Sequence, residues 1–401
     1  MPRVGWRKPP TDQRLSDHIS IGVLTRVYPP ELVDAVVEAT GRAGQRHRLM
    51  PARVTAYYVL AMTLFSGASY EEVMRLLVDG LAWQEGWRQE WQVPTKAGIY
   101  QARKRLGSEP LRALYEGTAR PLGTADTKGA WLRGWRLMSL DGTCLDVADT
   151  PANDAEFSRP GSGRGEGRGA FPQLRVVGLC EGGTHAIVDV AVGPYSSGET
   201  SLARGVLRSL QPGMLCLADR NFYSGALWAE ASATGADLLW RVKSDLTLTR
   251  QQDLADGSWL ATTGGRDARR RGRSHTVRVI DYALVDPGRS GEDGYRLLST
   301  VLDPDAAPAD ELAALYPERW EIETALGELK THQRGPRVVL RSKKPDGVLQ
   351  EAYGYLCVHY AIRTLMHEAA LKADLDPDRL SFTRSLRVAR RTTGSHPGFS
   401  P

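Results

Sequence analysis

A segment near residue 320 carries a carboxylate, a guanidinium and an ammonium group at helical spacing. Residues 316–330 read YPERWEIETALGELK. In a helix with 3.6 residues per turn, Arg319 and Glu323 lie one turn apart, and Lys330 follows two turns later. These three side chains therefore lie along one face of the helix, and Tyr316 lies near the same face. Such a face can hold a metal ion beside a phosphate chain. The alternative interpretation is a solvated helix with alternating charges.

Two aspartates in strand-like segments could complete such a site. Asp141 lies in MSLDGTCLDV, and Asp219 ends the apolar part of LCLADRNFYS. Acids at the carboxyl ends of strands line the crevice of an open sheet where ligands bind. Together with Glu323 they would form a hard-oxygen site for Mg²⁺ or Mn²⁺. Two such ions about 3.5–4 Å apart can drive phosphodiester cleavage. Taken alone, each aspartate could equally cap a turn.

Composition limits the classes of protein that remain. The chain has 401 residues and a formal charge of +5, with a sequence pI of about 9.0, so we expect two or three domains. The four cysteines form no CxxC pair, which argues against a zinc site or disulfides and fits a reducing cytoplasm. The N-terminus lacks a signal-peptide pattern, and the apolar run 54–65 is too short to cross a bilayer.

The first part of the chain has a helical pattern throughout. Apolar residues recur at helical spacing from residue 16 to about 122. Residues 95–106 place Arg103, Lys104 and Arg105 beside an apolar face. Two short helices followed by a basic one suggest an all-helical DNA-binding module related to helix-turn-helix proteins. A basic surface helix packed on a bundle remains the alternative.

The second part of the chain alternates strand and helix patterns. The order is three strands, a helix, a strand, a helix and a strand, over residues 137–147, 174–179, 185–192, 200–210, 214–217, 224–234 and 237–242. This order predicts a mixed sheet with helices packed on it. It matches the ribonuclease H-like fold.

Residues 243–304 do not fit that sheet, and we interpret them as a β-rich insertion. They contain short alternating strands, many glycines and the cluster RDARRRGR. Five arginines in eight residues exceed what solubility requires. We therefore predict DNA contacts from Arg269, Arg270 and Arg271.

The three acid-bearing segments resemble the DDE transposases of bacterial insertion sequences, in particular the insertion-element-four family. The helix signature of that family is Tyr, two residues, Arg, three residues, Glu, six residues, Lys, and it is matched by Tyr316, Arg319, Glu323 and Lys330. The DG pair at Asp141 and the DRNFYS segment that begins at Asp219 are also in the family's style. The resemblance covers roughly residues 16–370.

The resemblance implies an enzyme and its partners. Asp141, Asp219 and Glu323 would hold two Mg²⁺ (or Mn²⁺) ions, which drive cleavage at transposon ends and strand transfer into target DNA. The partners would be double-stranded DNA, both the terminal inverted repeats and the target, and a second copy of the chain in a homodimer. The location would be the bacterial cytoplasm, at the nucleoid, with no membrane.

The resemblance also suggests roles for single side chains. Arg319 and Lys330 would contact phosphates near the cleaved end, and Tyr316 would hydrogen-bond a phosphate or stack nearby. A β-rich insertion is typical of relatives that cut through a DNA hairpin, in which a tryptophan holds a flipped base. Trp259 is our candidate for that role and Trp240 the second choice, although a core tryptophan is the plainer interpretation of either.

The fold class that we predict is α/β, with a ribonuclease H-like core, a β-rich insertion and a preceding all-helical domain. The expected domains are an N-terminal DNA-binding domain (1–122), the catalytic domain (123–370, with the insertion at about 243–304) and a loose basic tail (371–401). Two alternative functions remain. One is a nuclease on the same fold without strand transfer, and the other is a catalytically inactive DNA-binding protein descended from a transposase.

Overall fold

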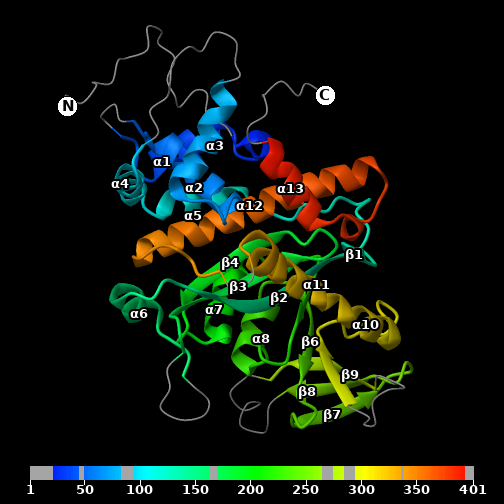
Figure 1. Ribbon diagram of the computed structural model, residues 1–401. Coiled ribbons are helices and arrows are strands. Elements are labelled where there is room, and N and C mark those ends of the chain that lie inside the picture. Colours follow the sequence, from blue (N-terminus) through cyan, green and yellow to red (C-terminus); the bar gives the residue numbers. More distant parts are fainter. Residues whose placement is uncertain are drawn as a thin grey trace, which may run out of the picture.

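The computed structural model describes residues 21–44, 49–82, 94–161, 169–263, 274–283, 294–335 and 338–392. In this part of the chain ten strands form one mixed sheet. Helices from both ends of the chain gather in a separate layer beside one end of the sheet (Figure 1). The mixed α/β class predicted from the sequence is therefore confirmed.

The order of the strands brings the two predicted aspartates together. The sheet runs β4-β3-β2-β5-β6-β10-β9-β8-β7, with the short β1 (Trp131–Leu132) paired to β2. The first five strands along it are β4 (Ile187–Pro194), β3 (Gln173–Glu181), β2 (Trp135–Asp146), β5 (Met214–Ala218) and β6 (Asp237–Val242). β2, β5 and β6 are parallel, whereas β3 is antiparallel to both of its neighbours. The strand that carries Asp141 thus lies directly beside the strand that leads to Asp219.

The predicted insertion is β-rich, but it extends the same sheet. Its strands are β7 (Leu248–Asp253), β8 (Trp259–Thr263), β9 (Thr276–Ala283) and β10 (Gly294–Ser299). β10 pairs antiparallel with β6, with Leu298 opposite Trp240. The expectation that residues 243–304 would not fit the sheet was wrong, because β10, the last strand of the insertion, pairs with the open edge of β6.

Alternating side chains along the central strands separate two layers of helices. Leu215 and Leu217 of β5 belong to a core with α10 (Ala309–Leu315), whereas Cys216 and Ala218 belong to the core that contains residues of α7 (Glu199–Val206) and α8 (Gly225–Ser232). Ser139 of β2 pairs with Leu217, so odd-numbered residues of β2 face the α10 side. Asp141 has the same parity and therefore faces that side as well.

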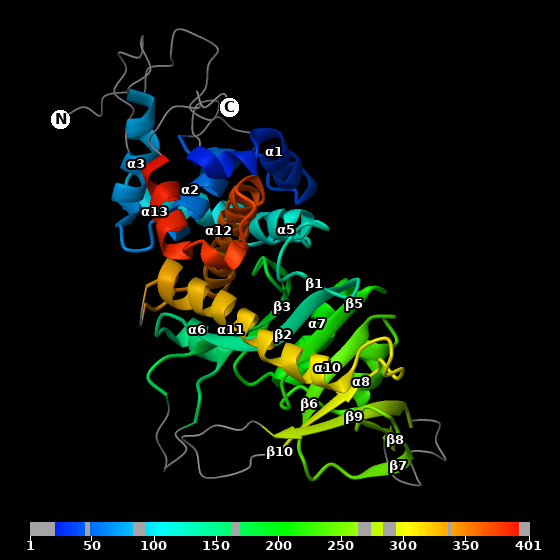
Figure 2. The ribbon, with the colours of Figure 1, turned by 90° about the vertical axis from the view of Figure 1, so that its right-hand side faces the viewer.

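The signature segment is helical but changes its type along its length. α10 runs into a 3₁₀ turn, η4 (Tyr316–Arg319), then α11 (Trp320–Gly327) and a π-helical turn, η5 (Glu328–Gln333). Figure 2 shows α10 and α11 following one another across the strands. A π turn advances by a smaller angle per residue than an α turn. Lys330 is therefore rotated away from the stripe on which uniform α-helical spacing placed it.

Every described element before residue 119 is helical. These helices are η2 (Gly22–Arg26), α1 (Pro30–Ala39), α2 (Ala52–Leu64), α3 (Tyr70–Ala82), α4 (Lys96–Leu106) and α5 (Glu109–Thr118). α2 and α5 pack on α12 (Pro345–Lys372), a 28-residue helix from the other end of the chain. Because their buried residues join one core, a domain boundary at residue 122 stays a prediction.

The segment after α12 is more ordered than we expected from the sequence. It forms a short turn, η6 (Pro377–Arg379), and the helix α13 (Phe382–Thr392), whose Phe382, Leu386 and Ala389 are buried. The prediction of a loose tail from residue 371 was wrong as far as residue 392, because apolar residues at helical spacing give this basic segment a face to pack. No helix among the described residues has the length and apolarity that a bilayer crossing requires.

Candidate active site

The two aspartates occupy equivalent positions on neighbouring parallel strands. Leu140 of β2 pairs with Ala218 of β5, and each is followed by one of the acids. Paired strands lie about 4.8 Å apart, so the two carboxylates begin from adjacent points of the sheet. Each also accepts a hydrogen bond from the amide that follows it, at 2.7 Å from Gly142 and 2.6 Å from Arg220. These bonds orient the carboxylate of Asp141 within β2 and that of Asp219 directly after the end of β5.

Arg319 links the third acid to the first. Its Nη2 donates to Glu323 Oε1 at 2.8 Å, as the one-turn spacing predicts, and its Nη1 lies 3.5 Å from Asp141 Oδ2. The Arg319 side chain is only 8% exposed, whereas that of Glu323 is 38% exposed. The guanidinium therefore holds Glu323 of α11 and Asp141 of β2 on one side of the sheet.

The positive charge and the hydrogen bond near the carboxylate of Asp141 do not offset the effect of its burial on its pKa. Burial raises its pKa to about 6, although the hydrogen bond from Gly142 and the charge of Arg319 act in the opposite direction. Glu323 and Glu199 add to the rise as further negative charges. Glu199, at the start of α7, lies against Gly142, where a Cβ atom would meet its carboxylate at 3.2 Å. A site with this excess of carboxylate oxygen is suited to a divalent cation.

The carboxylates of the three acids stand too far apart in this structure to bind one metal ion together. Among the histidine, cysteine, aspartate and glutamate side chains of the described residues, one group of three has its possible ligand atoms all within 4.8 Å of one another. It consists of His185, Glu321 and Asp378. Asp141, Asp219 and Glu323 are thus gathered on one face but stand further apart. Glu323 is half-exposed and is bonded to Arg319.

Of the two remaining signature residues, Tyr316 differs from its predicted role, whereas the phosphate contact of Lys330 stays a prediction. Tyr316 is buried, and its hydroxyl donates to the carbonyl of Ala218 at 3.2 Å. Burial raises the pKa of this hydroxyl far above its usual value. The hydroxyl therefore fixes the strand end before Asp219 and is not directed at solvent. Lys330 is exposed, and its charge reaches the thiol of Cys144, three residues after Asp141.

Only part of the basic set predicted to bind DNA is available on the surface. Arg103 is buried and donates to Gln350 Oε1 at 2.8 Å and Ser342 Oγ at 2.9 Å, so it joins α4 to α12. Its predicted DNA contact was wrong, because that face of α4 packs inward. Lys104 and Arg105 are exposed. Arg269, Arg270 and Arg271 lie outside the described residues.

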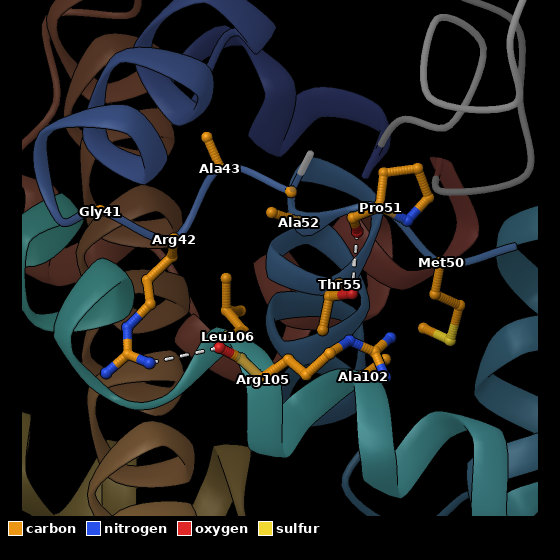
Figure 3. A pocket seen from close by; sticks show the side chains of 11 residues that line it. Gly41, Arg42, Ala43, Met50, Pro51, Ala52, Thr55, Ala102, Arg105 and Leu106 are labelled. Atoms are coloured by element: carbon orange, nitrogen blue, oxygen red, sulfur yellow. Dashed lines mark hydrogen bonds between the residues drawn. The ribbon is translucent and has the colours of Figure 1, made fainter. Parts of the chain in front are cut away.

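Arg105 lines a pocket of ≈ 370 Å³ between α2, α4 and the chain that follows α1 (Figure 3). Arg42 lies on the other side, and its Nη1 donates to the carbonyl of Arg105 at 3.4 Å. Pro51 and Ala52 bring the first turn of α2 to the same pocket. Two guanidinium groups beside a helix N-terminus make an electropositive hollow next to the predicted DNA-binding helix.

Neither tryptophan predicted to hold a flipped base has an open ring face. Trp259 is 7% exposed, donates to Asp281 at 3.2 Å and lies under the guanidinium of Arg250, 4.7 Å from the ring centre. Trp240 is fully buried edge-on to Trp228. A base could stack on Trp259 only after Arg250 moved away.

Sequence reasoning missed one exposed aromatic beside the acids. Trp320 opens α11, is 63% exposed and has the guanidinium of Arg319 6.0 Å from its ring centre. Its place in the signature, between Arg319 and Glu323, was the available signal. A flat exposed ring at this position is suited to stacking on a nucleic-acid base.

Comparison with known proteins agrees with the geometry. The family described as "Transposase DDE domain" matches residues 135–360, and "Insertion element 4 transposase N-terminal" matches residues 18–116. The transposase InsG of insertion sequence element IS4 from Escherichia coli K12 is 28% identical over 376 residues, which cover 93% of this chain and 83% of InsG. The chain is therefore a DNA transposase with a DDE domain. Within that class it belongs to the insertion element 4 family.

Solved structures give weaker similarity. A piggyBac transposase synaptic complex with hairpin DNA aligns with 93% of this chain and 79% of its own, at 10% identity and a TM-score of 0.48. An endonuclease V from Streptomyces avermitilis aligns with 55% of this chain and 93% of its own, at 16% identity and a TM-score of 0.23. The assignment to the family rests on the sequence matches.

Proposed function

We propose that this transposase cuts DNA at the ends of its element and joins the freed 3′-hydroxyl groups to target DNA on a ribonuclease H-like core. The observation that carries the proposal is the placement of Asp141, Asp219 and Glu323 on one side of the sheet, around Arg319. The strand order β4-β3-β2-β5-β6, with β3 antiparallel, supports that fold.

The residues present fit a divalent metal site. Three carboxylates supply hard oxygen ligands, and because burial raises the pKa of Asp141, a cation beside it would stabilise its charged form. We propose Mg²⁺ or Mn²⁺, with two ions per site and Asp141, Asp219 and Glu323 as ligands. When bound, such ions activate the attacking oxygen and stabilise the leaving one.

The remaining side chains bind and orient the DNA. Arg319 forms ion pairs with Asp141 and Glu323 in the protein alone, and its guanidinium is suited to exchanging them for a phosphate of the DNA. Lys330, exposed on η5, supplies a second phosphate contact. Tyr316 acts indirectly, because it holds the backbone before Asp219.

We propose terminal inverted repeats and target DNA as the partners, with a homodimer holding two ends together. Lys104 and Arg105 of α4 are the basic residues of the N-terminal helices that we expect on the DNA, and residues 1–122 are the proposed DNA-binding domain. The basic residues Arg269, Arg270 and Arg271 of the insertion stay in the proposal on the strength of the sequence.

The test is cleavage of labelled DNA that carries the element's own ends, with Mg²⁺, by the wild type and by Glu323→Gln. This substitution keeps the shape of the side chain and removes a ligand charge. We expect the wild type to nick the end and join it to target, and the variant to bind the DNA without doing either. Cleavage without joining would favour a nuclease. Binding without cleavage by both proteins would favour an inactive DNA-binding descendant.

A further inference from the structure

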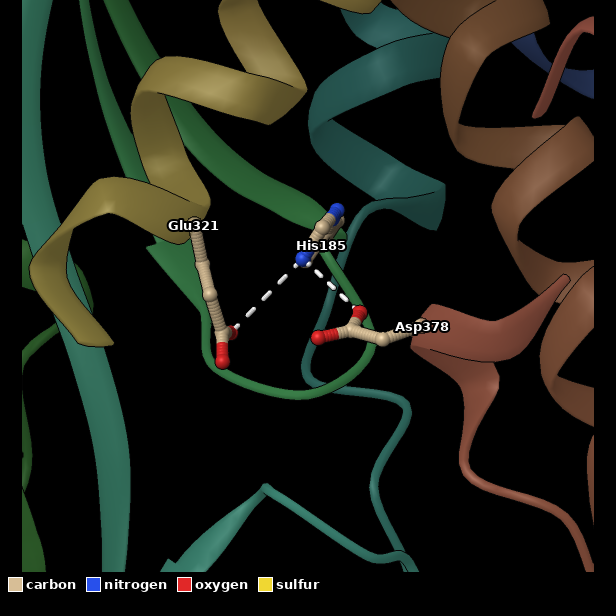
Figure 4. A group of neighbouring side chains, drawn as sticks. All are labelled: His185, Glu321 and Asp378. Atoms are coloured by element: carbon tan, nitrogen blue, oxygen red, sulfur yellow. Dashed lines mark ion pairs between the residues drawn. The ribbon is translucent and has the colours of Figure 1, made fainter. Parts of the chain in front are cut away.

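A second group of ionisable side chains lies behind the acid-bearing helix. His185 follows β3, Glu321 belongs to α11, and Asp378 belongs to η6 near the end of the chain, yet all three side chains point toward one another (Figure 4). His185 Nε2 lies 2.9 Å from Asp378 Oδ1 and 3.8 Å from Glu321 Oε2. Glu321 stands two residues before Glu323, on the opposite side of the helix.

The contacts of His185 decide what this group can do. Arg363 Nη2 lies 2.5 Å from His185 Nδ1, and because an arginine only donates, Nδ1 must accept. In the neutral ring the proton then resides on Nε2, which lies near the carboxylates of Asp378 and Glu321 but makes no well-aligned hydrogen bond to either. A metal ligand needs a lone pair on that nitrogen. The group is therefore a polar link between segments, although its ligand atoms lie close enough together for a metal.

The turn that carries His185 has a conformation with little freedom. Gly183 has a φ of +72°, and a Cβ atom there would meet the carbonyl oxygen of Lys128 at 2.6 Å and the amide of Ala130 at 2.7 Å. His185 itself has a φ of +54°, which is uncommon for a residue other than glycine. The amide of Gly183 donates to Glu321 Oε2, so this fixed turn holds α11 directly.

The helix is also held beyond Glu323. Glu328 of η5 is buried, accepts a bond from Arg363 Nε at 3.0 Å and lies 3.2 Å from His359 Nε2. Arg363 thus contacts both His185 and Glu328. Two buried carboxylates, two residues before Glu323 and five residues after it, tie the helix to α12 and to the turn after β3.

We propose that Glu321, His185 and Asp378 form a positioning cluster that sets where Glu323 stands relative to Asp141 and Asp219. The proposal rests on the proposed function of Glu323 as a ligand. None of the three touches the reacting atoms in this arrangement. Asp378 closes the cluster from the C-terminal segment, which makes that segment part of the catalytic unit. Misplacing a catalytic group by about 1 Å can cost about 100-fold in rate.

The first test compares nicking by the full-length wild type, Asp378→Asn, His185→Leu and His185→Gln across a range of Mg²⁺ concentrations. His185→Gln keeps an N–H donor at a similar reach. Asp374→Asn is the matched control, since it removes the same charge from the same segment at a side chain that is 94% exposed and pairs at 3.1 Å with the exposed Lys128.

We expect Asp378→Asn and His185→Leu to nick about 10- to 100-fold more slowly and to need more Mg²⁺ for half-maximal rate, with unchanged DNA affinity. His185→Gln should recover most of the rate. Wild-type rates in Asp378→Asn, or a His185→Gln variant no better than His185→Leu, would overturn the proposal. An inactive wild type would instead count against the proposed function.

The second test does not depend on activity. Amide hydrogen exchange of residues 320–327 in the protein alone should be about tenfold faster in Asp378→Asn than in Asp374→Asn. The exchange of β2 and β5 should stay the same in both. Equal protection of α11 in the two variants would refute the cluster even if the enzyme proved inactive.

Discussion

Replacing Asp141 by asparagine should stabilise the protein while it abolishes catalysis. Burial raises the pKa of Asp141 from 3.8 to about 6, so the folded state keeps a proton that the unfolded state has already lost. Stability contributed by this group therefore falls as the pH rises from about 4 to about 6. Above that range the folded protein bears the whole free-energy cost of ionising the buried Asp141. Asparagine has the same shape and no charge, so the variant avoids this cost.

The size of the effect follows from the same shift. Each pKa unit corresponds to about 1.36 kcal/mol, so ionised Asp141 costs roughly 3 kcal/mol at pH 7.5 and about half of that at pH 5. The variant loses the 3.5 Å contact with Arg319, which keeps Glu323 as its partner. The shift to about 6 already includes the attraction of Arg319, so nothing further is subtracted and the expected gain at pH 7.5 is about 3 kcal/mol.

Urea denaturation of the metal-free protein at pH 7.5 and pH 5.0 measures this gain. The free energy of unfolding of Asp141→Asn should exceed that of the wild type by more at pH 7.5 than at pH 5.0. The free energy of unfolding of Asp374→Asn should match the wild type at both pH values. Adding Mg²⁺ should stabilise the wild type and narrow the difference. A variant less stable than the wild type at pH 7.5, or an advantage that grows as the pH falls, would refute the reasoning.

Three further outcomes are expected from other parts of the chain. Arg103→Met should lower the free energy of unfolding by about 3 kcal/mol, since it leaves buried hydrogen-bond partners unpaired. It should leave the DNA affinity of the folded protein unchanged. A loss of DNA affinity without a loss of stability would restore the predicted role of Arg103 on DNA. Lys104→Ala and Arg105→Ala should each reduce the salt dependence of DNA binding by about 0.9 in log–log slope, measured by anisotropy, and an unchanged slope would remove α4 from the DNA interface. Deleting residues 381–401 should lower the melting temperature, because it uncovers the apolar surface under Phe382 and Leu386; an unchanged melting temperature would show that α13 adds nothing to the core.

The gathering of the acids on one face was predictable because it depends on local rules. Alternation along β2 fixes the side on which Asp141 lies, and the end of β5 fixes Asp219. The one-turn spacing of Arg319 and Glu323 gave their hydrogen bond directly. The π turn that carries Lys330 begins directly after Gly327, but a single glycine in a helical segment does not specify a π turn.

Contacts between distant segments could not be predicted from one sequence. Arg103 looked like a surface residue because its partner Gln350 lies 247 positions away. His185 and Asp378 have nothing in their local sequence that joins them to Glu321. The inward face of α13 was visible as helical spacing of Phe382 and Leu386, but its high content of arginine suggested a solvated tail.

The junction of β6 and β10 has a mechanical consequence. Hydrogen bonds run without interruption from β2, which bears Asp141, through β5, β6, β10 and β9 to β8, which bears Trp259. A sheet resists shear between its strands, so the insertion cannot swing on a hinge as a lid would. Its motions relative to the acids are limited to changes of twist along the sheet. Any load placed on the outer strands by a bound duplex is therefore transmitted, strand by strand, to the backbone at Asp219.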